Sequence, residues 1–96
     1  MAHYLVAQIT IEDRTGYATY EAGFMAIFAR YGGKLLAVDE SAVVLEGKWP
    51  FTRTVLIEFA DEASARAWYN SDEYQALAQH RYASSQANIV MIKGLQ

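Results

Sequence analysis

Alternating apolar and polar side chains predict two strands. In the first, residues His3 to Ile11, one face carries Leu5, Ala7, Ile9 and Ile11, and the other carries Tyr4, Val6, Gln8 and Thr10. In the second, residues Thr52 to Phe59, one face carries Val55, Ile57 and Phe59, and the other carries Thr54, Leu56 and Glu58. A period of two residues is typical of a strand that packs one face against a core.

Between these strands the apolar positions recur every three or four residues, which predicts a helix. Its stripe is mostly aromatic: Tyr17, Tyr20, Phe24, Ile27, Phe28 and Tyr31. Asp13 is the predicted N-cap, and Gly32-Gly33 is expected to end the helix. After Phe59, Asp61 is predicted to be the N-cap of another helix. Asn70-Ser71 interrupts that helix, and Ser71 is predicted to be the N-cap of the short helix that follows.

The remaining segments complete the order β-α-β-β-α-β. Lys34 to Asp39 and Ala42 to Glu46 are predicted as one long strand or two short ones, and Asn88 to Lys93 as the last strand. Over 96 residues, this order predicts one ferredoxin-like α+β domain with helices on one face of a four-stranded antiparallel sheet. The other face keeps apolar side chains, so a second copy of the chain is predicted to cover it and form a homodimer.

Composition and charge exclude several classes of protein. The net charge is −3, and the eight basic residues do not cluster, which argues against a nucleic-acid partner. The chain has no cysteine, which excludes disulfides and thiolate chemistry. No apolar run reaches the roughly 20 residues of a membrane helix, so no membrane association is predicted and the expected location is cytoplasmic.

Three stretches carry a resemblance to a known family. These are Val44 to Pro50, Val55 to Phe59, and Ala65 to Gln75, whose Trp-Tyr-x-Ser-x-x-Tyr pattern is the most specific part. The chain resembles the bacterial family catalogued as domain of unknown function 1330 over nearly its whole length. It departs from the family pattern at Arg14, where such sequences often have proline.

The resemblance implies the dimeric α+β barrel superfamily, in which two ferredoxin-like sheets face each other. Relatives in that superfamily include cofactor-independent monooxygenases, muconolactone isomerases, haem-degrading enzymes and chlorite dismutases. The family itself has no assigned activity, and one fold hosts unrelated chemistries. The resemblance therefore implies a fold and a dimer rather than a reaction.

Glu58 is the candidate catalytic residue, because a carboxylate among Val55, Leu56, Ile57 and Phe59 must be paired, hydrogen-bonded or neutral if it is buried. It is predicted to face the barrel interior together with Gln8. One interpretation makes Glu58 a general base or ligand anchor with Gln8 as its hydrogen-bonding partner. The other makes the two a buried polar pair that fixes the register of the dimer.

Four further residues are candidate ligand-binding groups. Arg53 either pairs with Glu46 across the hairpin or holds an anionic ligand with its planar guanidinium. Arg81 ends an apolar helix face and is expected to meet an acidic group or a ligand carboxylate. Tyr69 offers a polar tip on an apolar body, which suits a pocket and an interface equally.

No cofactor or metal is predicted. His3 and His80 do not form a known metal-binding spacing with acidic residues, and no nucleotide-binding motif is present. The sequence thus predicts a homodimer that binds a small organic molecule between sheet and helices, with cofactor-independent acid–base or oxygenation chemistry. The alternative is a non-catalytic binding or stress-related module whose polar pocket residues only stabilise the dimer.

Overall fold

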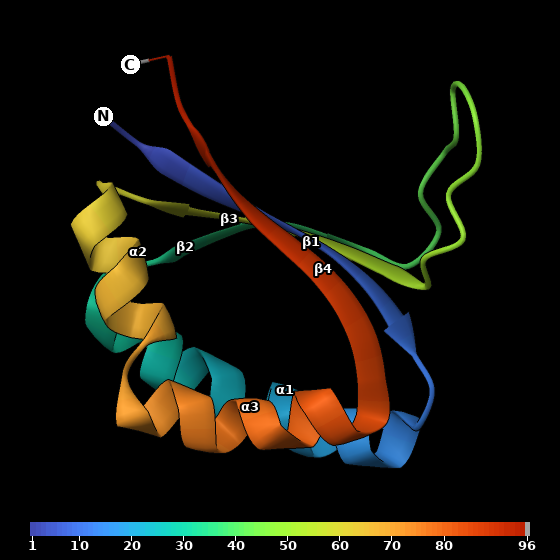
Figure 1. Ribbon diagram of the computed structural model, residues 1–96, viewed down its shortest axis with the longest axis horizontal. Helices are drawn as coiled ribbons and strands as arrows, with labels where there is room; N and C mark the ends of the chain where they lie inside the picture. Colours follow the sequence, from blue (N-terminus) through green and yellow to red (C-terminus); the bar gives the residue numbers. More distant parts are fainter. Residues whose placement is uncertain (96) are drawn as a thin grey trace.

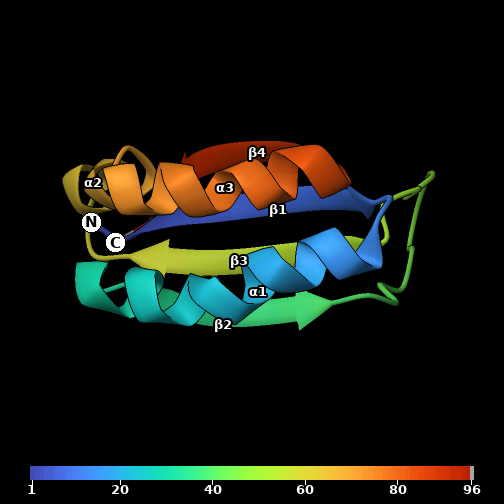
Figure 2. The same ribbon diagram turned by 90° about the horizontal axis from the view of Figure 1, so that it is seen from below.

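A four-stranded antiparallel sheet with helices on one face forms the protein, as a computed structural model of residues 1–95 shows (Figure 1). The elements are β1 (His3–Ile11), α1 (Arg14–Phe28), the 3-10 turn η1 (Ala29–Tyr31), β2 (Lys34–Asp39), β3 (Arg53–Phe59), α2 (Glu62–Tyr69), α3 (Asp72–Ser84) and β4 (Ser85–Lys93). The strand order is β2-β3-β1-β4. The helices lie on one side of the sheet, below it in Figure 1, and α1 and α3 run side by side (Figure 2). The predicted ferredoxin-like α+β fold is confirmed.

Local capping signals set where the helices begin and end. The carboxylate of Asp13 accepts a hydrogen bond from the backbone N of Thr15 at 3.1 Å, and the carboxylate of Asp61 accepts one from Ser64 at 2.7 Å. The hydroxyl of Ser71 accepts one from the backbone N of Tyr74 at 3.1 Å, which starts α3. Gly32 ends η1 with φ of 78°, a conformation that costs glycine little. The predicted caps are confirmed.

Two strand boundaries differ from the prediction. Ala42 to Glu46 is not a strand, because β2 ends at Asp39 and residues 40–52 form a loop. The carboxylate of Asp39 accepts a hydrogen bond from the backbone N of Ser41 at 2.7 Å, and this short turn directs the chain away from the sheet. The last strand begins at Ser85, three residues before the predicted start at Asn88, because α3 leads directly into β4.

The core lies between the sheet and the helices. Its buried apolar residues are Leu5, Ile9, Tyr17, Tyr20, Phe28, Ile57, Phe59, Ala65, Trp68, Tyr74 and Ala78. Phe28 is fully buried, with its ring centroid 5.4 Å from that of Phe59 and 5.5 Å from that of Trp68. Phe24, another ring of the predicted aromatic stripe, packs against this core but is only partly buried.

The opposite face of the sheet has no helix over it (Figure 1). The strand register aligns Leu56, Val6 and Val90 in one apolar row across β3, β1 and β4. A second row aligns Thr54, Gln8 and Asn88. Val90 is 55% exposed and Ile92 50% exposed. We call this surface the open face.

None of the helices in residues 1–95 has both the length and the apolar character that a membrane span requires.

The aromatic core gives a first prediction. Phe28→Ala should lower the free energy of unfolding by about 3–5 kcal/mol, because it removes a fully buried ring. Phe24→Ala should lower it less, because part of that ring is already in water. Denaturant unfolding of the two variants measures both values, and equal losses would contradict this account of the core.

Candidate functional site

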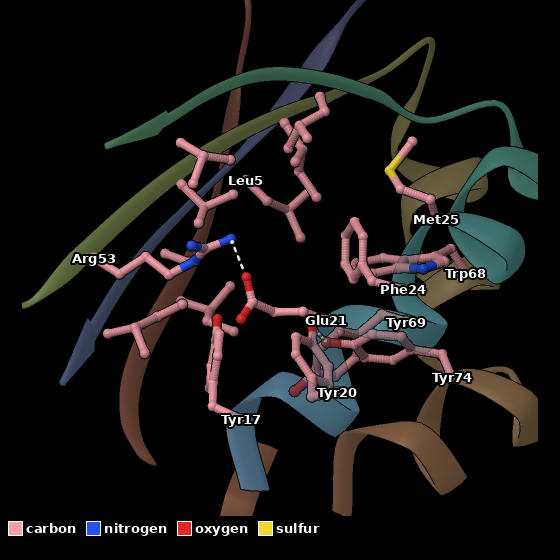
Figure 3. Close-up of a pocket in the computed structure, with 17 residues that line it drawn as sticks. Leu5, Tyr17, Tyr20, Glu21, Phe24, Met25, Arg53, Trp68, Tyr69 and Tyr74 are labelled. Atoms are coloured by element: carbon pink, nitrogen blue, oxygen red, sulfur yellow. Dashed lines mark hydrogen bonds and ion pairs between the residues drawn. The ribbon is translucent and has the colours of Figure 1, made fainter. Parts of the chain in front are cut away.

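A cavity of about 160 Å³ lies between the sheet and the helices (Figure 3). Most of its lining is apolar or aromatic: Leu5, Ala7, Ile9, Tyr17, Tyr20, Glu21, Phe24, Met25, Leu35, Val38, Arg53, Val55, Ile57, Trp68, Tyr69, Tyr74 and Ile89. Three of these residues, Met25 of α1 with Leu35 and Val38 of β2, are 40–49% exposed. The pocket therefore opens between α1 and the edge strand β2, through an apolar mouth.

An ion-pair network occupies one end of the pocket, which we call the Arg53 end. The Nη2 atom of Arg53 lies 3.3 Å from Oε2 of Glu21, and its Nη1 atom lies 3.0 Å from Oε2 of Glu40 (Figure 3 shows the first pair). Arg14 lies 2.9 Å from the same oxygen of Glu40. The guanidinium of Arg53 also lies 5.5 Å from the ring centre of Tyr17. The carboxylates of Glu21 and Glu40 thus fix the position of the Arg53 guanidinium, which extends from β3.

Two groups in this network have pKa values shifted in opposite directions, for different physical reasons. Hydrogen bonds from Arg14 and Arg53 hold the pKa of the Glu40 carboxyl below its ordinary value. Burial raises the pKa of the Tyr17 phenol, and the charge of Arg53 opposes part of that rise. At neutral pH the network therefore contains an ionised Glu40 carboxylate and a neutral Tyr17 phenol.

Aromatic residues with polar atoms line the other end of the pocket, which we call the tyrosine end. The hydroxyls of Tyr20 and Tyr74 lie 2.8 Å apart, and burial raises the pKa of Tyr20. The Nε1 atom of Trp68 is buried and has no hydrogen-bond partner within residues 1–95. The guanidinium of Arg81, which is 4% exposed, lies 5.7 Å from the ring centre of Tyr20.

The structure separates the sequence-predicted site residues. Arg53 and Tyr69 line the pocket, and Arg81 lies against Tyr20, which also lines it. Glu58 and Gln8 point to the open face, on the other side of the sheet. The side chain of Glu58 is 23% exposed and lies 3.8 Å from Lys34.

Two expected pairings are wrong. Gln8 pairs across the sheet with Thr54, whereas Glu58 pairs with Tyr4, so Gln8 and Glu58 are not cross-strand neighbours. The Glu58 carboxylate raises the pKa of the Tyr4 phenol by hydrogen bonding and charge repulsion.

The pair of Glu46 and Arg53 is also absent, because Glu46 lies in the loop of residues 40–52 and Arg53 turns to Glu40 and Glu21 instead. The hairpin prediction assumed a strand that continues to Glu46. Because β2 ends at Asp39, the acidic residue at the base of the loop, Glu40, takes that position.

Several pocket residues with polar atoms were not identified from the sequence as site residues, among them Glu21, Tyr20 and Trp68. Glu21 follows Tyr17 by four residues, so the two are neighbours on the helix surface. This spacing could have indicated a carboxylate beside the aromatic stripe. Trp68 packs in the buried core, yet its indole N–H has no hydrogen-bond partner within residues 1–95. Within residues 1–95 no three histidine, aspartate or glutamate side chains gather as metal ligands.

The geometry defines a ferredoxin-like α+β protein with a pocket between its two layers. The family model described as "Domain of unknown function (DUF1330)" matches residues 2–95. The chain belongs to this family. Comparison with curated proteins gives no match.

Solved structures share the fold at low sequence identity. A protein of unknown function from Rhodopseudomonas palustris, RPA0582, aligns with a TM-score of 0.83 and 18% identity, covering 99% of this chain and 83% of that one. A dimeric ferredoxin-like protein of unknown function from Jannaschia sp. CCS1 aligns with a TM-score of 0.73 and 15% identity, covering 98% and 100%. SnoaB, a cofactor-independent oxygenase from Streptomyces nogalater, aligns with a TM-score of 0.71 and 16% identity, covering 99% and 94%.

The ion-pair network predicts a pH effect on stability. Since the pKa of Glu40 is lowered in the folded protein, its ionisation stabilises the fold above the pKa of the unfolded chain, and this contribution is lost as the pH falls through the folded pKa. Between about pH 7 and about pH 3, the free energy of unfolding should therefore fall less in Glu40→Gln than in the wild type. Denaturant unfolding at both pH values measures this.

The matched control for this test is Glu46→Gln. Glu46 is exposed and makes no ion pair within residues 1–95, so this change should leave the pH dependence as in the wild type. An identical response of the two variants would show that the network does not act on stability.

Proposed function

We propose that the chain binds a small, mainly apolar organic molecule in the pocket between sheet and helices. The observation that carries this proposal is the cavity of about 160 Å³, enclosed mostly by aliphatic and aromatic side chains. Apolar protein cavities of about 150 Å³ stay dry and take up benzene. A molecule with one six-membered ring therefore matches the volume, and a longer one would extend through the mouth between α1 and β2.

Polar groups at both ends of this pocket support an oriented ligand. Binding sites for small molecules typically combine an apolar lining with a few placed polar groups. Here Arg53 is held by Glu21 and Glu40 at one end, and Tyr20, Tyr74 and Trp68 supply hydrogen-bonding groups at the other. A ligand with one polar end would be oriented along the axis between the two ends.

Cofactor-independent acid–base or oxygenation chemistry is a further proposal for this pocket. Glu21 is the carboxylate that lines the cavity, and it is ion-paired with Arg53. The SnoaB structure is that of a cofactor-independent oxygenase, but at 16% identity it shares only the fold. The alternative, a non-catalytic binding module, is favoured by the position of Glu58 on the open face.

We further propose that the protein acts as a homodimer whose subunits join through the open face. The apolar row of Leu56, Val6 and Val90 runs across three strands, and an exposed apolar face of a sheet is a typical interaction surface. A fold neighbour from Jannaschia is described as dimeric. In such a dimer the Tyr4–Glu58 pair would lie between the two sheets.

The pocket proposal is tested by filling the cavity. Ala7 lines the cavity from β1, so Ala7→Leu should weaken the binding of benzene or indole about tenfold or more, because the added methyl groups take the space of the ligand. Isothermal titration calorimetry measures the affinity, and circular dichroism checks the fold.

Ala42→Leu is the control for this test, because it makes the same chemical change in the exposed loop. This variant should bind as the wild type does. Equal binding by Ala7→Leu would show that the probe lies elsewhere on the protein.

The dimer proposal is tested by charging the open face. Val90 is 55% exposed in the single chain, so Val90→Glu should leave the fold intact while desolvation of its carboxylate opposes association. Sedimentation of the wild type at micromolar concentration should give twice the mass of one 10.8 kDa chain, and Val90→Glu should give one chain. Ala83→Glu, which adds the same charge on the exposed surface of α3, should remain dimeric, and a monomeric wild type would refute the proposal.

A further inference from the structure

Hydrogen-bond donors outnumber acceptors at the tyrosine end of the pocket. Trp68 is 3% exposed, and its Nε1, which can only donate, has no hydrogen-bond partner among residues 1–95. In the pair of Tyr20 and Tyr74, one hydroxyl donates to the other, so the second hydroxyl retains a hydrogen for a further acceptor. A buried donor without an acceptor costs free energy, and a ligand oxygen in the pocket would relieve that cost.

A buried positive charge lies behind these donors. Arg81 is 4% exposed, and its Nε is buried without a hydrogen-bond partner. No carboxylate lies within 4.0 Å of its guanidinium in the part of the chain that the structure describes. The guanidinium instead lies 4.8 Å from the ring centre of Tyr82 and 5.7 Å from that of Tyr20. Aromatic faces attract a cation but do not neutralise its charge.

The other groups around Arg81 leave this charge unbalanced. The titratable side chains that interact with it are phenols from two helices, Tyr17 and Tyr20 of α1 with Tyr74 and Tyr82 of α3. Burial raises the pKa values of Tyr17, Tyr20 and Tyr82, so these phenols are neutral at physiological pH. β4 contributes no titratable side chain before Lys93. The nearest pocket carboxylate, Glu21, already pairs with Arg53.

We propose that the tyrosine end of the pocket binds the oxygen of a phenol or enol as its anion, with Arg81 supplying the balancing charge through the intervening tyrosines. This inference rests on the proposed binding function and names its ligand class. The aromatic walls and the volume of about 160 Å³ fit a planar ring. Burying an anion in an apolar cavity is costly unless it is paired, and Arg81 supplies the nearby positive charge.

The binding step is a simple ionisation without redox chemistry. The O–H bond of the phenol breaks, the proton passes to water or buffer, and the electron pair stays on the bound oxygen. Because a positive charge favours the ionised form of a neighbouring acid, the pKa of the ligand should fall when it binds.

The test uses 4-nitrophenol, whose anion absorbs visible light, and nitrobenzene as its analogue without the hydroxyl. For the wild type we expect the ionisation midpoint of bound 4-nitrophenol to fall by about one pH unit or more below that of the free probe, which equals a roughly tenfold preference for the anion. Arg81→Met should return the midpoint to that of the free probe or above it. Lys48→Met removes the same charge from the exposed loop and should leave the shift unchanged.

A second variant keeps the test valid if Arg81→Met does not fold. Trp68→Phe retains a buried ring but removes the indole N–H, and it should weaken the binding of 4-nitrophenolate more than that of nitrobenzene. Binding of both probes with an unshifted or raised midpoint would overturn the anion proposal and leave the pocket function standing. Tighter, Arg81-dependent binding of 4-nitrobenzoate without a shift for 4-nitrophenol would overturn the choice of a phenolate. Failure of the wild type to bind any of the three probes would refute the pocket function itself.

Discussion

The packing of Trp68 against three other rings is the interaction on which the rest of the structure depends. Its ring centre lies 5.5 Å from those of Phe28 and Phe59 and 4.2 Å from that of Tyr74. These four residues come from α2, α1, β3 and α3, so one aromatic cluster joins both layers. Rings of this size bury a large apolar area. The cavity lies beside this cluster, where smaller side chains such as Ala7 and Val55 face the helices.

The sheet separates two surfaces with different chemistry, because successive side chains of a strand point to opposite faces. On β3, Arg53, Val55 and Ile57 face the pocket, whereas Leu56 and Glu58 face outward. Glu58 therefore does not line the pocket. The open face can serve association while the pocket serves binding, and each can be altered without changing the other.

Local signals explain why most of the fold could be predicted from the sequence. Alternation over β1 and β3 and the caps at Asp13, Asp61 and Ser71 depend on neighbouring residues, and these are confirmed. The pairings that involved Glu46 or Gln8 depend on where a loop leaves the sheet and on strand register, which alternation does not define.

The pocket itself was harder to predict in detail. Arg81 was correctly placed on the inner side of its helix with Tyr74. Its lack of a carboxylate partner depends on the rotation and packing of two helices, which no short stretch of sequence encodes. The same holds for the unpartnered N–H of Trp68, because a hydrogen-bond deficit appears only when every neighbour in space is known.

Arg53 and Arg81, at the two ends of the pocket, differ in their charge partners, and this difference produces an electric field along the cavity. Arg53 and Arg14 pair with Glu21 and Glu40, so each arginine at the Arg53 end has a carboxylate partner. Arg81 lies against the rings of Tyr20 and Tyr82 and has no carboxylate within 4.0 Å in residues 1–95, so the tyrosine end retains one positive charge inside the protein. Screening by salt is weak in a buried site, and the field therefore acts along the length of the cavity. Under the proposed binding function, that field would help to orient a polar ligand, with its electron-rich atom toward Tyr20 and Tyr74.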